Sequence, residues 1–394
     1  MPRVAPFRGL RYDPAVAGSL QDLTAPPYDV ISEPTRGAYL GASPYNVVHL
    51  DLARGPADPA RPDNRYAAAA SLLASWKETG ALALAPEPCF YAYEVRWPGT
   101  VDNPGGSIRG VFVALTLEPW GGSIVPHEHT MPGPVADRLH LLRATAVHLS
   151  PIYGTVSGPC YRLADLLERT CATPALEDLV DEEGVTHRLW EVDGMTPVGT
   201  WLADEELLIA DGHHRYTTAL VYRDERHAAD GPGPWDAILA LVVDTGTQRV
   251  PVLPYHRVQV SGPPPIGGEP AADLADLMSR LADDDLAVGT ITSDPDGASL
   301  AYRVLHLHGP PPVVRALHDE LLDERAPDEA LRFTHSATDA EAAVRAGEAV
   351  AAYILPPTTP DRILDAIDRG DRLPRKSTFF WPKPRTGMIF MPVR

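Results

Sequence analysis

The order of apolar and polar positions along the chain predicts alternating strands and helices. The runs 89–97 and 108–117 are rich in β-branched and aromatic residues, and the prolines and glycines between them indicate a hairpin. The run 65–78 consists of helix formers, with a capping residue before it and a glycine after it, so we predict a helix there. A strand over 206–210 is expected to lead directly into a helix over 214–226.

The remaining pattern predicts an α/β fold with a mixed sheet. Prolines at 26 and 27 force an extended loop. Further helices are expected at 137–146, 271–281 and 338–346, and further strands at 4–12, 188–192, 235–244, 250–260, 301–307 and 350–355.

Composition divides the chain into three parts. A run rich in proline and glycine from 261 to 268 indicates a boundary. We therefore expect a main catalytic α/β domain over 1–260 and a smaller α/β subdomain over 261–373. The basic, aromatic tail 374–394 is expected to return to the core, because three consecutive aromatic residues need burial and 388–393 alternates like a strand.

Charge and cysteine content restrict the function. The 394-residue chain has a formal net charge of −19, which opposes binding to nucleic acid. No apolar run is long enough for a membrane helix, and the start of the chain lacks a secretory pattern, so we expect a cytoplasmic protein without a membrane partner. Cys89, Cys160 and Cys171 have no paired spacing and are expected to be packing residues.

The strongest chemical signal is the run Asp211-Gly212-His213-His214-Arg215, where an apolar strand meets a helix start. Exposed N–H groups at a helix start favour an anion, glycine allows close approach, and arginine can hold two phosphate oxygens. The run is therefore a candidate phosphate site. The alternative is that Asp211 only caps the helix and the polar residues face solvent. Because a first helical turn tolerates lysine as well as arginine, Arg215→Lys is expected to leave folding almost unchanged.

A second signal is His127-Glu128-His129. In a strand both imidazoles would share one face, as half of a metal site that His213 or His214 could complete. Alternatively, Glu128 could act as a base on a hydroxyl group, and in a phosphatase His127 or His214 could assist an attacking water molecule.

Two further groups of residues are candidates for contacts with the substrate or its phosphate. The tail supplies cations and hydroxyl groups at Lys376, Ser377, Thr378 and Lys383. Arg138 and Arg143 stand near the histidine motif, although their helical spacing also admits surface ion pairs.

The sequence resembles, nearly from end to end, a family of bacterial proteins grouped as a domain of unknown function, number one thousand and fifteen. The resemblance rests on Pro6 to Tyr12, Ala25 to Ser32, Ser43 to Val47, Pro126 to Glu128, Asp137 to Leu139, Asp211 to Tyr216 and Lys376 to Gly387. Tyr28, Asp29 and Asn46 lie in these motifs and are expected, with Arg138 and Arg143, to contact substrate.

A shorter segment, Leu208 to Arg215, resembles the phosphate-binding turn of the ParB and sulfiredoxin-like superfamily. Free serine kinases of that superfamily carry the same Asp-Gly-His-His-Arg motif. The resemblance implies a ParB/sulfiredoxin-like core with large insertions. It also implies that residues 211–215 bind ATP or ADP, with Mg²⁺, and that an early glutamate is catalytic. Glu128 is our choice for this glutamate, and Asp29 is the rival.

We therefore expect a phosphotransferase that acts between a nucleotide and a hydroxy amino acid such as serine or phosphoserine, with Asp211, His127, His214 and Glu128 as catalytic candidates. Three alternatives remain: a phosphoserine-type phosphatase, a non-enzymatic nucleotide-binding regulator, and a metal-dependent hydrolase that uses His127, His129 and His214. Zinc in protein purified without added metal would favour the last.

Overall fold

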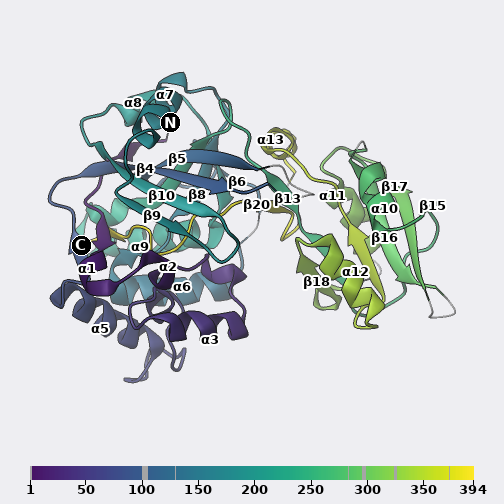
Figure 1. Ribbon diagram of the computed structural model, residues 1–394, viewed down its shortest axis with the longest axis horizontal. Helices are drawn as coiled ribbons and strands as arrows, with labels where there is room; N and C mark the ends of the chain where they lie inside the picture. Colours follow the sequence, from purple (N-terminus) through teal and green to yellow (C-terminus); the bar gives the residue numbers. More distant parts are fainter. Residues whose placement is uncertain are drawn as a thin grey trace. The chain divides into compact units, whose positions relative to one another are not determined.

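The computed structural model describes residues 2–99, 105–128, 130–282, 284–294, 299–323, 326–371 and 373–394. The chain forms two compact units (Figure 1). Unit 1 comprises Met1–Pro126, Thr130–Arg249 and Pro382–Arg394, and unit 2 comprises His127–His129 and Val250–Trp381. Each unit is therefore assembled from segments that are distant in the sequence.

Unit 1 is built on a mixed sheet in the order β6-β11-β8-β12-β5-β4-β10-β9, with β1 paired to β5. β11 runs parallel to β6 and antiparallel to β8, whereas β12 runs parallel to β8. The strands are β1 (Val4–Ala5), β4 (Cys89–Trp97), β5 (Gly106–Thr116), β6 (Ile124–Pro126), β8 (Ile152–Val156), β9 (Glu177–Val180), β10 (Thr186–Asp193), β11 (Leu207–Asp211) and β12 (Ala237–Asp244). This mixture of parallel and antiparallel pairs confirms the expected α/β class with a mixed sheet.

Helices cover both faces of this sheet. Figure 1 shows α7 and α8 on one side of the sheet and α5 and α6 on the other. The helices of unit 1 are α1 (Pro14–Ala17), α2 (Leu20–Leu23), α3 (Glu33–Ala42), α4 (Val48–Asp51), α5 (Arg65–Glu78), α6 (Pro132–Thr145), α7 (Tyr161–Cys171), α8 (Val198–Trp201) and α9 (His213–Asp230), with a 3₁₀ turn η1 at Tyr28–Val30. In the described part of the chain, no helix has both the length and the apolar character needed to cross a membrane.

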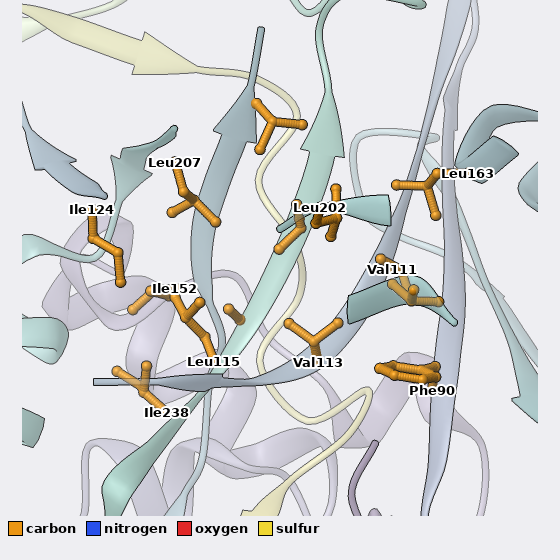
Figure 2. Packing of buried hydrophobic residues seen from close by; sticks show 14 of the residues in the cluster. Phe90, Val111, Val113, Leu115, Ile124, Ile152, Leu163, Leu202, Leu207 and Ile238 are labelled. Atoms are coloured by element: carbon orange, nitrogen blue, oxygen red, sulfur yellow. The ribbon is translucent and has the colours of Figure 1, made fainter. Parts of the chain in front are cut away.

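The core of unit 1 lies between the sheet and its helices. Figure 2 shows buried aliphatic side chains from neighbouring strands, including Val111, Val113 and Ile152, packed together with Leu163 of α7 and Leu202 just after α8. Burial of such side chains contributes about 1.5–3 kcal/mol each to folding. This packing holds β8, β11 and β12 in fixed register, and the candidate phosphate turn follows β11.

The segment Pro382–Arg394 completes unit 1. Thr386 pairs with Ala25, Phe390 pairs with Leu10, and β21 (Met391–Pro392) pairs with β7 (Val147–His148). A short ladder between β2 (Leu10–Tyr12) and β3 (Leu82–Leu84) lies beside this segment. The strand predicted over 388–393 thus exists, but as two residues and an isolated bridge rather than one long strand.

Unit 2 is built on an antiparallel sheet in the order β15-β17-β16-β19-β14-β18 and a separate β13–β20 pair. Its strands are β13 (Val252–Pro254), β14 (His256–Gln259), β15 (Glu269–Ala271), β16 (Ala287–Ser293), β17 (Leu300–His306), β18 (Leu331–Thr334), β19 (Ala351–Ile354) and β20 (Thr378–Phe380). Its helices include α10 (Leu274–Leu281), α11 (Val313–Leu317), α12 (Ala337–Arg345) and α13 (Pro360–Asp368).

The division into units differs from the domain boundaries expected from composition. β14 lies before the run of prolines and glycines but pairs with β18 and β19, so unit 2 begins at Val250. Unit 2 also retains residues up to Trp381, because β20 pairs with β13. A linker-like composition marks a surface loop here, and strand pairing decides to which unit a segment belongs.

Candidate functional site

The candidate phosphate turn has the predicted strand-turn-helix form. β11 ends at Asp211, and α9 starts at His213. Gly212 adopts φ +100°, and a Cβ atom there would lie 2.8 Å from Cγ2 of Ile152. Gly212 therefore serves both conformation and close packing. It is the capping residue of α9, and Asp211 forms ion pairs with Arg215 and Lys383, which capping of the helix alone would not require.

Arg215 is fixed by its surroundings. Its Nη1 donates to Ser150 Oγ at 3.1 Å and to the carbonyl oxygen of Pro151, and its Nη2 donates to Asp211 Oδ2. The side chain is 10% exposed. Among the described residues, none accepts a hydrogen bond from its buried Nε. A lysine has one nitrogen and cannot reproduce this fork, so the expectation that Arg215→Lys leaves folding unchanged does not fit the structure.

Lys383 brings the tail to the same turn. Its Nζ lies 2.5 Å from Asp211 Oδ1 and 3.0 Å from Asp29 Oδ2. The lysine side chain is 7% exposed. Four predicted site residues, Asp29, Asp211, Arg215 and Lys383, therefore form one partly buried network of alternating charge.

The two histidines of the turn have different environments. His213 is buried and stacks on Trp120, with ring centroids 6.3 Å apart. His214 Nε2 accepts a hydrogen bond from the backbone N–H of Met131 at 3.0 Å.

Arg138 is buried rather than a surface residue. Its Nη1 donates to Asp51 Oδ1 at 2.7 Å, and its guanidinium lies 4.3 Å from the centre of the Tyr28 ring. Burial raises the pKa of Tyr28 to about 12, against the opposing effects of Arg215 and Arg138. Tyr28, Arg138 and Arg215 therefore belong to one electrostatic environment, and a surface ion pair does not describe Arg138.

Two other predicted substrate residues have structural contacts. Arg143 forms an ion pair with Glu225, and both side chains are exposed. Asn46 is fully buried; its amide nitrogen donates to the carbonyl oxygen of Asp22 at 2.7 Å, and its oxygen accepts from the N–H of Val48 at 3.0 Å. Its role in this structure is to hold the turn that precedes α4.

Unit 2 holds the histidine motif against its own tail segment. Glu128 Oε1 accepts a hydrogen bond from the N–H of Ser377 at 3.1 Å, and His127 Nε2 lies 2.7 Å from Thr378 Oγ1. Lys376 has φ +54°, and its Nζ lies 5.1 Å from the centre of the Tyr255 ring. Glu128 and the predicted residues Lys376, Ser377 and Thr378 thus form a second group, within unit 2.

No metal centre is apparent among the residues that the structure describes. Within those residues, no three or more histidine, cysteine, aspartate or glutamate side chains are grouped so that they could hold a metal ion. His129, a ligand in the predicted metal site, lies outside the described residues.

The family model described as "Protein of unknown function (DUF1015)" matches residues 4–265. The chain belongs to this family. No curated protein matches the DUF1015 chain.

Three solved structures are similar to the DUF1015 chain. A free serine kinase in complex with AMP has 13% identity and a TM-score of 0.36, over 69% of this chain and 88% of its own. A conserved hypothetical protein from Pyrococcus furiosus has 15% identity and a TM-score of 0.31, over 66% and 90%. SbnI from Staphylococcus aureus, truncated at its C-terminus, has 11% identity and a TM-score of 0.33, over 67% and 82%. These scores are too low to support an inference about activity.

Two buried charged residues of the DUF1015 chain were missed at the level of sequence. Asp51 is 6% exposed and bonded to Arg138. The feature of the sequence that could have indicated it is a lone carboxylate inside the largely apolar run 47–52. Arg257 is fully buried on β14 and donates to the carbonyl oxygens of Tyr255 at 2.6 Å and Lys376 at 3.0 Å. Burial lowers the pKa of Arg257 to about 9, and the charge of Glu128 opposes this shift.

The network in unit 1 of the DUF1015 chain combines two cations and two carboxylates beside the start of a helix. The first N–H groups of α9 and the cations of Arg215 and Lys383 lie at one end of β11. Their carboxylate partners, Asp211 and Asp29, hold the cations in position. Groups fixed in this way need little reorganisation when charge develops on a bound ligand.

Proposed function

We propose that this protein transfers a phosphoryl group between a nucleotide and a small hydroxy amino acid such as serine or phosphoserine, in either direction. The observation that carries the proposal is the Asp211–Arg215–Lys383 network at the start of α9. The resemblance of residues 208–215 to a phosphate-binding turn supports the same assignment.

The chemistry of phosphoryl transfer suits this network. Most of the catalysis in such reactions comes from positioning and from electrostatic stabilisation of the equatorial oxygens. The N–H groups of His213 and His214, at the first turn of α9, would bind phosphate oxygens. The guanidinium of Arg215, next to this helix start, would place a fixed positive charge beside the phosphate. Lys383 would add a second cation.

The carboxylates of the network fit the needs of Mg²⁺. This ion is commonly held by one or two carboxylates together with the phosphates of the substrate. Asp29 and Asp211 both contact Nζ of Lys383, so these two carboxylates already flank a single cationic centre. When bound, Mg²⁺ would neutralise charge on the phosphates.

Glu128 is proposed to orient or deprotonate the hydroxyl group of the acceptor, and Asp29 remains the rival. Glu128→Gln separates the two. If Glu128 is the base, this variant should lose turnover by roughly 100-fold or more while nucleotide binding is retained, whereas near-normal turnover would leave Asp29 as the base.

The experiment is a ³¹P NMR assay of the full chain with ATP or ADP, Mg²⁺ and L-serine, and in reverse with phosphoserine and AMP or ADP. Phosphoserine formation that depends on nucleotide is the expected result. Arg215→Lys should lower turnover, whereas Arg169→Lys, an exposed pair with Asp165 on α7, should not. Release of inorganic phosphate from phosphoserine without nucleotide would instead show a phosphatase. No turnover or nucleotide binding in any combination would reject the proposal.

A further inference from the structure

A cavity of about 240 Å³ opens in unit 1 between α3, α4, α5 and α6. Its charged wall contains three arginines and three carboxylates. These are Arg36, Arg65, Arg138, Glu33, Asp51 and Asp137. Its wall is therefore polar but formally neutral. A neutral wall of mixed sign gives no general attraction for an isolated anion, but it suits a ligand that carries both signs.

One buried carboxylate in this wall has unused hydrogen-bonding capacity. Asp51 is 6% exposed, and its Oδ1 accepts from Arg138. In the part of the chain that the structure describes, no hydrogen bond reaches Oδ2. Asp51 lines the cavity, so a ligand or water there can donate a hydrogen bond to this oxygen. Oδ2 is thus a specific acceptor for a cationic donor such as an ammonium group.

A cation with unused donors lies in the same wall. Nη2 of Arg65 contacts Asp137 and the hydroxyl group of Tyr66, whereas its Nε and Nη1 donate to no other described residue. The side chain is one-third exposed. Nε and Nη1 lie on different edges of the guanidinium, and each retains N–H groups that can donate to a carboxylate. The cavity therefore offers one acceptor for a positive group and one cation with unused donors for a negative group.

The cavity adjoins the phosphate network. A smaller hollow of about 40 Å³ is lined by Ser150 and Arg215 and shares Asp51, Arg138 and Leu141 with the larger cavity. A ligand held at Asp51 would therefore have a neighbouring space that leads toward Arg215.

The size of the cavity suits a small ligand. Its volume of about 240 Å³ is many times the roughly 10–15 Å³ that one water molecule requires on this measure. A small amino acid, with about seven non-hydrogen atoms, therefore fits this space.

We propose that this cavity is an amino-acid site, in which Asp51 binds the α-ammonium group and Arg65 binds the α-carboxylate. The role as acceptor site rests on the proposed phosphotransfer, but binding itself does not. The site takes a free zwitterionic amino acid, and its neighbouring hollow directs the side-chain hydroxyl group toward Arg215.

The test is isothermal titration calorimetry of the full chain without nucleotide. L-serine should bind. Ethanolamine lacks the carboxylate and 3-hydroxypropanoate lacks the ammonium group, so each should bind at least about tenfold more weakly, since a hydrogen bond to a charged group contributes roughly 1.5–3 kcal/mol. These comparisons use the unaltered protein and do not depend on the folding of any variant. No binding of L-serine, or equal binding of all three compounds, would overturn the assignment.

Variants then locate the site. Asp51→Asn and Arg65→Gln should each weaken L-serine binding at least about tenfold, and the exposed control Arg169→Lys should leave it unchanged. Unchanged binding in a folded Arg65→Gln protein would refute the site.

The proposed function and the proposed amino-acid site can be rejected independently of each other. If L-serine binds as predicted but phosphoserine never forms, only the proposed function is rejected. If phosphoserine forms while binding ignores Asp51 and Arg65, only the location is rejected.

Discussion

Replacing Lys383 by methionine removes the ammonium group that bridges two carboxylates and keeps most of the side-chain volume. In the folded chain Nζ lies 3.0 Å from Asp29 and 2.5 Å from Asp211, and only 7% of the lysine side chain is exposed. The variant leaves both carboxylates facing a space that an apolar group now fills. We expect a clear loss of stability in unit 1.

The magnitude follows from the geometry. Removal of one partner from a buried ion pair costs about 3–5 kcal/mol. Asp29 and Asp211 keep some contact with water, and Arg215 still pairs with Asp211, so the lower end of this range applies. A loss of about 3 kcal/mol corresponds to a fall in Tm of roughly 6–12 °C for a unit of this size.

Differential scanning calorimetry of the full chain measures this effect. The sequence contains only three lysines, and the exposed Lys77 on α5 provides a matched control, since Lys77→Met should change stability by less than about 0.5 kcal/mol. Asp29→Asn combined with Lys383→Met should recover about 1 kcal/mol, because one of the two like charges is then absent. If Lys383→Met were as stable as Lys77→Met, the bridging role of Lys383 would be refuted.

Three further predictions concern unit 1. Arg215→Lys should lower turnover by roughly thirtyfold to a thousandfold. It should also lower the free energy of unfolding by about 2 kcal/mol, because the hydrogen bond from the guanidinium to Ser150 is lost. Normal turnover in kinetic assays would contradict the proposed site. Burial lowers the pKa of His148 to about 4 from its usual 6.5, so the unfolded chain binds the proton more readily between these values and stability should fall by up to about 3 kcal/mol as pH decreases through this window. Urea titrations at several pH values should show this slope, and His148→Asn should flatten it. Phe390→Ala should cost about 3–5 kcal/mol because the ring is fully buried, and a change below about 1 kcal/mol in urea unfolding would show that the tail packs loosely.

Local chemistry could be predicted from the sequence because it depends on neighbours along the chain. The helix predicted over 65–78 is observed as α5 with the same bounds, since the side chain of Asn64 accepts hydrogen bonds from the N–H groups of Tyr66 and Ala67. The strand before Asp211 and the helix after it could also be predicted from local sequence. Their prediction rests on the periodicity of apolar residues and on the glycine between them.

Contacts over long sequence distances could not be predicted in this way. β11 pairs with β6 and β8, and no feature of its own residues selects those partners. Lys383 was a candidate because of its charge, but its contact with Asp29 depends on how the tail threads through unit 1. The pairing of Asp51 with Arg138 likewise joins two helices whose sequences carry no common signal. Whether Glu128 acts together with the turn at Asp211 stays a prediction.

The discontinuity of unit 1 has a consequence for the order of events during protein synthesis. Residues 250–381 must be translated before Pro382–Arg394 exists, and at about 5–20 residues per second this takes roughly 7–26 s. During that interval Ala25 and Leu10 lack the backbone partners that Thr386 and Phe390 later provide. Lys383 does not yet separate Asp29 from Asp211. The nascent chain can therefore form the sheet of unit 1 early, but the ion-pair network of Lys383, Asp29 and Asp211 is completed only after unit 2 has been made, which places assembly of this candidate site among the last steps of biogenesis.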